Sequence, residues 1–196
     1  MKETKNKMNR EAWLTAVVVM AEAMFKAAEL EYPEAWRVSC GFPSKGGAGS
    51  NRKTVGECHY EMNSGDGFRE MFVSPYLGTS VDAIKTLLHE VVHACLGPGK
   101  GHRAEFSQAC KRLGFEGKPT QAVPSDEVWG PFFEAAVAKL GEYPHATLNT
   151  AGRKKQATRM IKVACPCGCS ARMTRKWLEE VGPPVCGCGE QMEIEL

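Results

Sequence analysis

The chain has 196 residues, enough for one domain of ordinary size and a small appendage. Hydrophobic residues make up 43% of it and charged residues 24%, a balance that excludes a disordered or fibrous protein. The formal net charge of +2 is too small to indicate a polyanionic partner. An interaction with nucleic acid would therefore have to come from local clusters of cations.

The N-terminal region has some features of a secretory signal, because lysines precede a short apolar run and an Ala-Glu-Ala stretch. Apolar residues continue past that stretch at spacings of three and four, which predicts an amphipathic helix over about 9–30, capped by Asn9. No segment approaches the roughly 20 uninterrupted apolar residues of a membrane span. We therefore expect a cytoplasmic protein, and not a secreted, disulfide-bonded peptidase or a membrane protein.

Three β-like stretches follow the first helix, at 36–40, 54–60 and 69–77. The segment between the first two, GFPSKGGAGSN, is too polar and too rich in glycine for a core. We expect it to be an exposed loop near a cleft.

Helical patterns dominate the next part of the chain. A helix is expected over 80–96, with Thr79 or Ser80 as its cap, Asp82 completing a capping box, and Gly97-Pro98 ending it. A second helix follows His102 and is closed by Gly114, and a third covers about 127–140 with Pro131 in its first turn. Strands and helices in this order predict an α+β fold.

The segment 87–102, LLHEVVHACLGPGKGH, contains an HExxH pattern. Of the motifs in the chain, this one is the most specific indication of a chemical function. His89 and His93 are four residues apart, so on a helix they share one face and can hold one metal ion. Helical histidines are often only hydrogen-bonded, but this pair lies on a capped apolar helix. We expect His102 to be the third ligand, because the GPGKG segment can fold the chain back. Weaker candidates for a metal ligand are Glu105, His59 and His145.

The same pattern predicts a hydrolase. Zinc accepts imidazole nitrogen readily and lowers the pKa of a bound water toward neutrality. Glu90 follows the first histidine directly and is placed to act as a general base on that water. The sequence favours zinc but leaves another divalent ion open.

Five of the nine cysteines lie in the last 32 residues, in CPCGC and CGCG. Cysteines two apart rarely bond to each other, whereas paired clusters offer thiolates to a metal. The distance between the clusters suits a zinc ribbon, although each pair is one residue shorter than CxxC. We expect Cys165, Cys167, Cys186 and Cys188 to hold a structural zinc, with Cys169 able to replace Cys165 or Cys167. The other four cysteines are expected to be small buried hydrophobes.

The composition changes near residue 145, and residues 151–178 contain eight Lys or Arg and no acid. We predict a catalytic domain over 1–145, a basic linker over 146–157 and a ribbon over 158–196. Lys and Arg give sequence-independent affinity for phosphates, and an aromatic ring can stack on bases. The alternative is a solvated face, since five later acids offset part of the charge. The expected DNA contacts, to single or double strands, are Arg153, Lys154, Lys155, Arg159, Arg172, Arg175, Lys176 and Trp177.

These motifs resemble the SprT-like zinc metalloproteases, the family of the Spartan proteases that degrade proteins crosslinked to DNA. The resemblance is carried by TLLHEVVHA, by GHRAEF, and by the cysteine pairs after a basic KKQATR stretch. It covers about 36 to the end of the chain and is greatest with small bacterial and phage-borne members. Two features depart from the family: the loop before His102 is shorter than in eukaryotic members, and the cysteine pairs are tighter.

The resemblance implies a zincin-like domain in which His89, His93 and His102 hold a catalytic zinc and Glu90 is the catalytic glutamate. It also implies an endopeptidase that acts on DNA-associated proteins, as in the repair of DNA–protein crosslinks, with the ribbon as a DNA-binding module. The rival hypothesis is a DNA-binding or scaffold protein that keeps the zincin fold without proteolysis.

Overall fold

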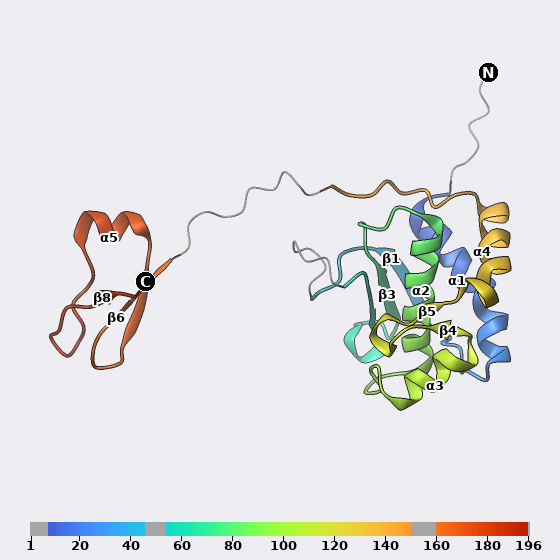
Figure 1. Cartoon of the computed structure of the whole chain (residues 1–196), viewed down its shortest axis with the longest axis horizontal. Coiled ribbons are helices and arrows are strands. Elements are labelled where there is room, and N and C mark those ends of the chain that lie inside the picture. Colours follow the sequence, from blue (N-terminus) through green and yellow to red (C-terminus); the bar gives the residue numbers. More distant parts are fainter. Residues whose placement is uncertain (1–7, 46–53, 150–159, 196) are drawn as a thin grey trace, which may run out of the picture. The chain divides into compact units, whose positions relative to one another are not determined.

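The computed structural model describes residues 8–45, 54–149 and 160–195 (Figure 1). The chain divides into two compact units, a first unit over Met1–Asn149 and a second unit over Thr150–Leu196. Both units combine helices with strands, so the predicted α+β class is confirmed. None of the helices in the described ranges has the length and apolar character needed to cross a bilayer.

Helix α1 (Arg10–Ala27) begins at the predicted cap, since the side chain of Asn9 accepts a hydrogen bond from the Ala12 N–H. It ends earlier than Leu30 because Glu29 has a φ of 56°, a left-handed conformation that does not continue a helix. Its apolar face is buried in the core of the first unit. The buried residues are Trp13, Leu14, Val17, Val18, Ala21 and Phe25.

Strands β1 (Trp36–Cys40), β2 (Gly56–His59) and β3 (Arg69–Val73) form a sheet in the order β1-β3-β2. The central strand β3 pairs parallel with β1 and antiparallel with β2. A short 3-10 helix (Glu61–Asn63) lies in the connection from β2 to β3. β2 is consequently an edge strand, with one side of its backbone unpaired within this sheet.

Helix α2 (Ser80–Leu96) is the central element of the first unit and contacts β2, β3, α1, α3, α4 and β5. Its predicted boundaries are correct: the Thr79 hydroxyl accepts from the Asp82 N–H and donates to the Asp82 carboxylate. Gly97 ends the helix with a φ of 76°, a conformation that favours glycine. The helix with the predicted ligands is thus fixed at both ends and packed on several sides.

The remaining elements of this unit are α3 (Ala104–Arg112), β4 (Phe115–Glu116), a 3-10 turn (Pro119–Gln121), β5 (Val123–Pro124) and α4 (Asp126–Leu140). The prediction that Pro131 lies in the first turn of the last helix is wrong. Ser125 caps α4 by accepting from the Val128 N–H, so Pro131 lies inside the helix. Trp129, in the helical turn before the proline, is buried, and its indole N–H donates to the Leu113 carbonyl. These contacts stabilise the first turn of α4.

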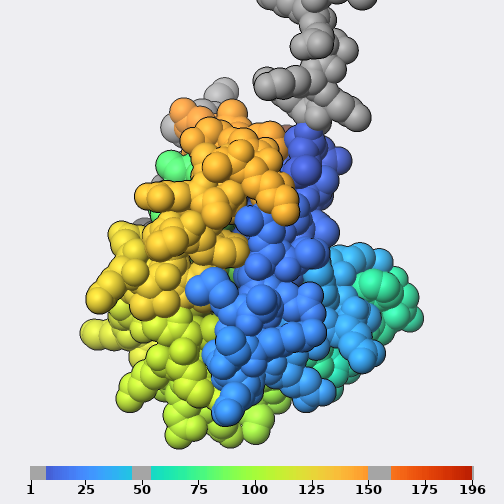
Figure 2. All heavy atoms as spheres, turned by 90° about the vertical axis from the view of Figure 1, so that its right-hand side faces the viewer, coloured from blue at the N-terminus to red at the C-terminus, as the bar shows by residue number. Residues whose placement is uncertain are grey.

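Helices α1 and α4 lie side by side on one face of the first unit, as Figure 2 shows. The indole N–H of Trp13 donates to the carbonyl of Gly141, the residue that ends α4. The chain then continues through 142–149 without a helix or strand, and Leu148 donates its N–H to the Pro75 carbonyl. Most of the predicted linker 146–157 lies outside the described residues.

The second unit is a small sheet with one helix. Strands β6 (Ile161–Ala164), β7 (Ser170–Met173) and β8 (Glu193–Ile194) form it in the order β7-β6-β8, and α5 (Arg175–Val181) follows β7. Its core consists of five buried residues: Val163, Cys165, Leu178, Cys186 and Met192. The cap of α5 is Thr174, and sequence analysis did not predict this helix.

Candidate metal centres

The three predicted histidine ligands converge on one point. His89 and His93 lie on α2, and His102 lies in the loop that leads to α3. Their Nε2 atoms lie close together, with 3.1 Å from His89 to His102 and 3.1 Å from His93 to His102. One ligand atom from each of the three side chains lies within 4.8 Å of the other two. The glycine-containing turn after α2 therefore brings the chain back as expected.

This geometry suits a zinc ion. Zinc–nitrogen bonds of 2.0–2.1 Å at tetrahedral angles place two nitrogens about 3.3 Å apart, close to the observed separations. Burial and, to a smaller extent, the neighbouring imidazoles lower the pKa of His93 to about 3. The pKa values of His89 and His102 are also lowered, in both cases chiefly by burial. The rings are therefore neutral near pH 7 and have a lone pair to donate.

Two neighbours orient the rings. The Nδ1 atom of His89 lies 2.6 Å from the Ala122 carbonyl oxygen, which fixes the proton on Nδ1 and leaves Nε2 free for a metal. Phe106 on α3 packs against all three imidazoles, with ring centroids 5.0 Å from His89, 4.4 Å from His93 and 4.9 Å from His102. Sequence analysis gave Phe106 no role at the metal site. Its position four residues after His102, in the first turn of the helix expected there, was the available signal.

Glu90 lies beside the three histidines. Its side chain is 5% exposed, and its carboxylate makes no hydrogen bond within the part of the chain that the structure describes. Burial and, to a smaller extent, the negative charge of Glu57 raise the pKa of Glu90 to about 8. A divalent cation at the histidines would lower that pKa and favour the carboxylate. Glu90 is thus a buried acid, without a hydrogen-bond partner among the described residues, next to a candidate metal site.

The histidines and Glu90 line a cavity of about 380 Å³. One wall comes from the edge strand, with Gly56, Cys58 and nearby residues, and the other from residues 120–123. A cavity between an edge strand and a helix can admit an extended chain.

The three weaker candidates for a metal ligand are not in the histidine group. The Glu105 carboxylate pairs with the Lys100 ammonium at 3.1 Å. His59 lies 3.4 Å from a carboxylate oxygen of Glu57, and His145 Nε2 lies 2.9 Å from the Pro75 carbonyl.

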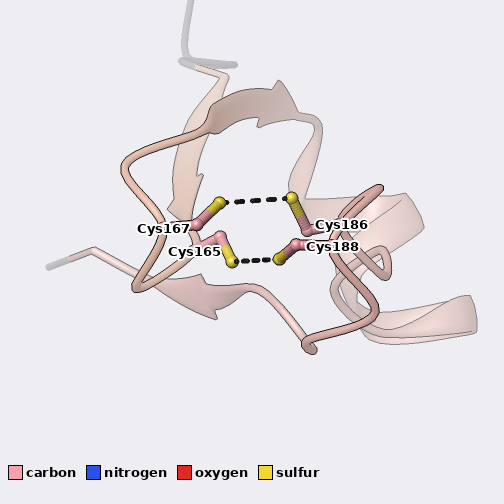
Figure 3. Close-up of side chains that lie close together, drawn as sticks. All are labelled: Cys165, Cys167, Cys186 and Cys188. Carbon is pink, nitrogen blue, oxygen red and sulfur yellow. Dashed lines mark hydrogen bonds between the residues drawn. The ribbon is translucent and has the colours of Figure 1, made fainter.

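The second candidate centre consists of four cysteines in the second unit. Figure 3 shows the side chains of Cys165 and Cys167 facing those of Cys188 and Cys186. The Sγ atoms of Cys165 and Cys188 are 3.5 Å apart, and those of Cys167 and Cys186 are 3.6 Å apart. Four thiolates around zinc, with bonds of 2.3 Å, lie roughly 3.8 Å apart, whereas a disulfide needs about 2.05 Å. All nine cysteines are free thiols, so the cluster suits a metal and not a disulfide.

The two cysteine turns have the same backbone pattern, which explains the position of Cys169. In the first turn, the Cys165 N–H donates to the Cys169 carbonyl and the Gly168 N–H donates to the Cys165 carbonyl. The second turn repeats both bonds, with Glu190 in the place of Cys169. Cys169 thus occupies a position whose equivalent is not a cysteine, and its sulfur lies outside the four-thiol group.

The predicted DNA contacts fall into two groups. Arg153, Lys154, Lys155 and Arg159 lie outside the described residues. Arg172, Arg175, Lys176 and Trp177 are exposed on the second unit, and Trp177 is 51% exposed. Two of these cations pair with acids along α5: Arg175 with Glu179 at 3.9 Å and Lys176 with Glu180 at 3.8 Å.

The charge balance of the second unit follows from these acids. Residues 160–195 contain four Lys or Arg and five Glu. Four thiolates around a divalent ion would add two negative charges to that region. Positive charge is therefore concentrated in 150–159, which contains four Lys or Arg and no acid.

Comparisons of the chain with protein-family models, curated proteins and solved structures found no match. The resemblance to the SprT-like family stays a prediction that rests on the sequence motifs.

Proposed function

We propose that the chain is a zinc-dependent endopeptidase of the SprT-like type, built on a zincin-like domain with a C-terminal zinc ribbon. The observation that carries the proposal is the position of Glu90, a buried carboxylate without a hydrogen-bond partner among the described residues. It lies in the wall of a cavity lined by three neutral imidazoles. A structural core position would not leave an acid unpaired beside metal-type ligands.

In this proposal His89, His93 and His102 hold the zinc. When bound, zinc supplies a Lewis acid that polarises the peptide carbonyl and lowers the pKa of water toward neutrality. Glu90 accepts a proton from the attacking water, whose oxygen forms the new bond to the carbonyl carbon. Glu90 then delivers that proton to the leaving amine as the C–N bond breaks. Ala122 keeps the proton of His89 on Nδ1 throughout, so the ligand set does not change.

The shape of the cavity favours a polypeptide substrate. The outer edge of β2 pairs with no other strand among the described residues, and an extended peptide can pair with such an edge. The residues that line the cavity are mostly small, which suits a broad choice of side chains. They include Thr54, Val55, Gly56, Thr86, Thr120 and Ala122.

We further propose that the ribbon and the basic segment before it bring the enzyme to proteins on DNA. The four cysteines would hold a structural zinc, and the cations of 150–159 with Trp177 would contact phosphates and bases. Closely spaced free thiols suit a reducing compartment, so we propose a cytoplasmic location.

The substitution Glu90→Gln tests the peptidase, because it keeps the size of the side chain and removes its basicity. We expect cleavage of casein or histones to fall by roughly 10²- to 10⁴-fold, the usual contribution of a general base. Metal analysis should still find two zinc ions per chain. In His93→Ala, we expect the loss of one zinc and of cleavage together.

The matched control is Glu105→Gln, an exposed acid outside the histidine group, which should leave cleavage unchanged. Assays with and without DNA separate the peptidase from its rival. A wild-type protein that holds two zinc ions and binds DNA, but cleaves nothing, would support a non-proteolytic scaffold.

A further inference from the structure

The edge strand β2 comes unusually close to α2 at Gly56. Thr86 and Glu90 are four residues apart on α2, so they share the helix face that meets this strand. A Cβ atom placed on Gly56 would lie 2.8 Å from Cγ2 of Thr86 and 3.0 Å from Cδ of Glu90. It would overlap one carboxylate oxygen of Glu90 even more severely. Any side chain at this position would therefore take the space of the carboxylate.

The backbone conformation does not require glycine here. Gly56 is not among the glycines with a positive φ, and it pairs with Val73 in a regular antiparallel ladder. Glycine inside a strand weakens it, because it has no side chain to pack and more freedom to lose. At this position, glycine allows the backbone of β2 to approach Thr86 and Glu90 closely.

Among the described residues, only packing contacts determine where the Glu90 carboxylate lies. The group makes no hydrogen bond to any described residue, so no polar partner fixes its rotamer. The backbone of β2 forms the wall on one side, and the helix backbone limits the other rotamers. Because Gly56 adds no Cβ to this wall, the carboxylate can lie toward the cavity that the three histidines line.

We infer that Gly56 is a positioning residue for Glu90: its missing side chain lets the edge strand hold the carboxylate at the metal site. This inference rests on the proposed peptidase function for its effect on catalysis. The contact between Gly56 and Glu90 is independent of that function and can be tested without it.

The first measurement uses Gly56→Ala in the zinc-loaded full chain. We expect two zinc ions per chain, a KM within about 2-fold of wild type, and a kcat lower by roughly 100-fold, since a displacement of about 1 Å can cost that much. The control is Gly65→Ala, where an added Cβ meets no atom within 4 Å, and it should keep the wild-type kcat. A raised KM with unchanged kcat would instead make Gly56 a substrate contact and overturn the inference.

The second measurement does not depend on activity. Gly56→Ala should lower the urea midpoint of the first unit in the wild-type background, and lower it less in Glu90→Ala, where the overlapping carboxylate is gone. Equal shifts in the two backgrounds would overturn the inference. If Gly56→Ala does not fold, the double variant with Glu90→Ala should fold, and failure of both would count against it. A wild type without peptidase activity would reject the proposed function, while this comparison would still decide the contact.

Discussion

The two candidate metal centres differ in how much of the fold depends on the ion. The three histidines lie over a large core that includes Trp13, Phe25 and Trp129, and none of these three buried side chains is a metal ligand. In the second unit, two of the four cysteines are themselves part of a five-residue core. From this comparison we predict that the first unit folds without a metal ion, whereas the second unit folds only when an ion is bound.

The number of ligands agrees with this difference. Three imidazoles would leave one position of a tetrahedral ion free for water or substrate, as in catalytic zinc sites. Four thiolates would fill the coordination shell of such an ion, as in structural zinc sites, and would leave no position for a substrate. Substitutions in the two centres should therefore have different consequences for folding, metal binding and activity.

The largest effect is expected from Cys186→Ala. Binding of zinc contributes about 10–16 kcal/mol to the folding of small zinc modules, far more than a core of five residues can replace. We expect the second unit to unfold and the first unit to stay folded, read by NMR or by amide exchange on the full chain. In His93→Ala both units should remain folded. Protected amides in the second unit of Cys186→Ala would contradict the comparison.

A smaller effect is expected from Glu90 in the metal-free protein. The folded carboxyl keeps its proton up to a pKa of about 8, whereas the unfolded chain releases it near 4.5. The native state then binds more protons than the unfolded state, so the free energy of unfolding decreases as pH rises between these values.

The substitution Glu90→Gln removes this dependence. We expect it to raise the free energy of unfolding of the metal-free first unit by an amount on the order of 3 kcal/mol at pH 8, with little gain at pH 4. Urea titrations with chelator at the two pH values measure this. The gain should be smaller with zinc bound, because the cation favours the carboxylate. A gain that is equal at both pH values would show that burial of charge is not its cause.

The next effect concerns Phe106, which packs against all three imidazoles. Leucine keeps the position apolar but loses the flat ring surface, so the three ligands should be held less firmly. We expect Phe106→Leu to weaken zinc binding at the histidines by about 10-fold and to leave the cysteine centre unchanged. Competition with a chromogenic chelator measures both sites. The control is Phe115→Leu, an aromatic residue that packs on Trp129 instead.

The parts of the structure that sequence analysis predicted correctly depend on local signals. The caps of α1 and α2 follow from Asn9 and Thr79, and the metal-type spacing of His89 and His93 follows from one helical period. The return of the chain to His102 needed only a helix stop and a short glycine-containing loop. Each of these features involves residues close together in sequence.

The missed features depend on contacts between distant segments. The parallel pairing of β1 with β3 and the support of His89 by the Ala122 carbonyl join residues more than 30 positions apart. Local rules place Pro131 in a first turn, because they cannot show that Trp129 before it is buried. Gly56 looks like an ordinary strand residue in the sequence, since the residues it meets, Thr86 and Glu90, come 30 and 34 positions later.

The smallest effect is expected from the cations of α5. Arg175 and Lys176 already pair with Glu179 and Glu180, and residues 160–195 have no excess of positive charge. A phosphate would have to compete with these acids, so we expect Arg175→Ala with Lys176→Ala to change DNA affinity by less than about 3-fold. Lys154→Ala with Lys155→Ala should weaken binding more and reduce the salt slope by roughly 2, one for each lost phosphate contact.

These two double variants form a matched comparison, because each removes two positive charges from the same chain. Fluorescence anisotropy with labelled DNA over a range of salt concentrations measures both, on single and double strands. The reverse order would mean that the acids of α5 release their partners on binding, and that the ribbon itself is the main DNA contact. A Trp177→Ala variant then separates stacking from charge, since stacking on bases contributes affinity that changes little with salt.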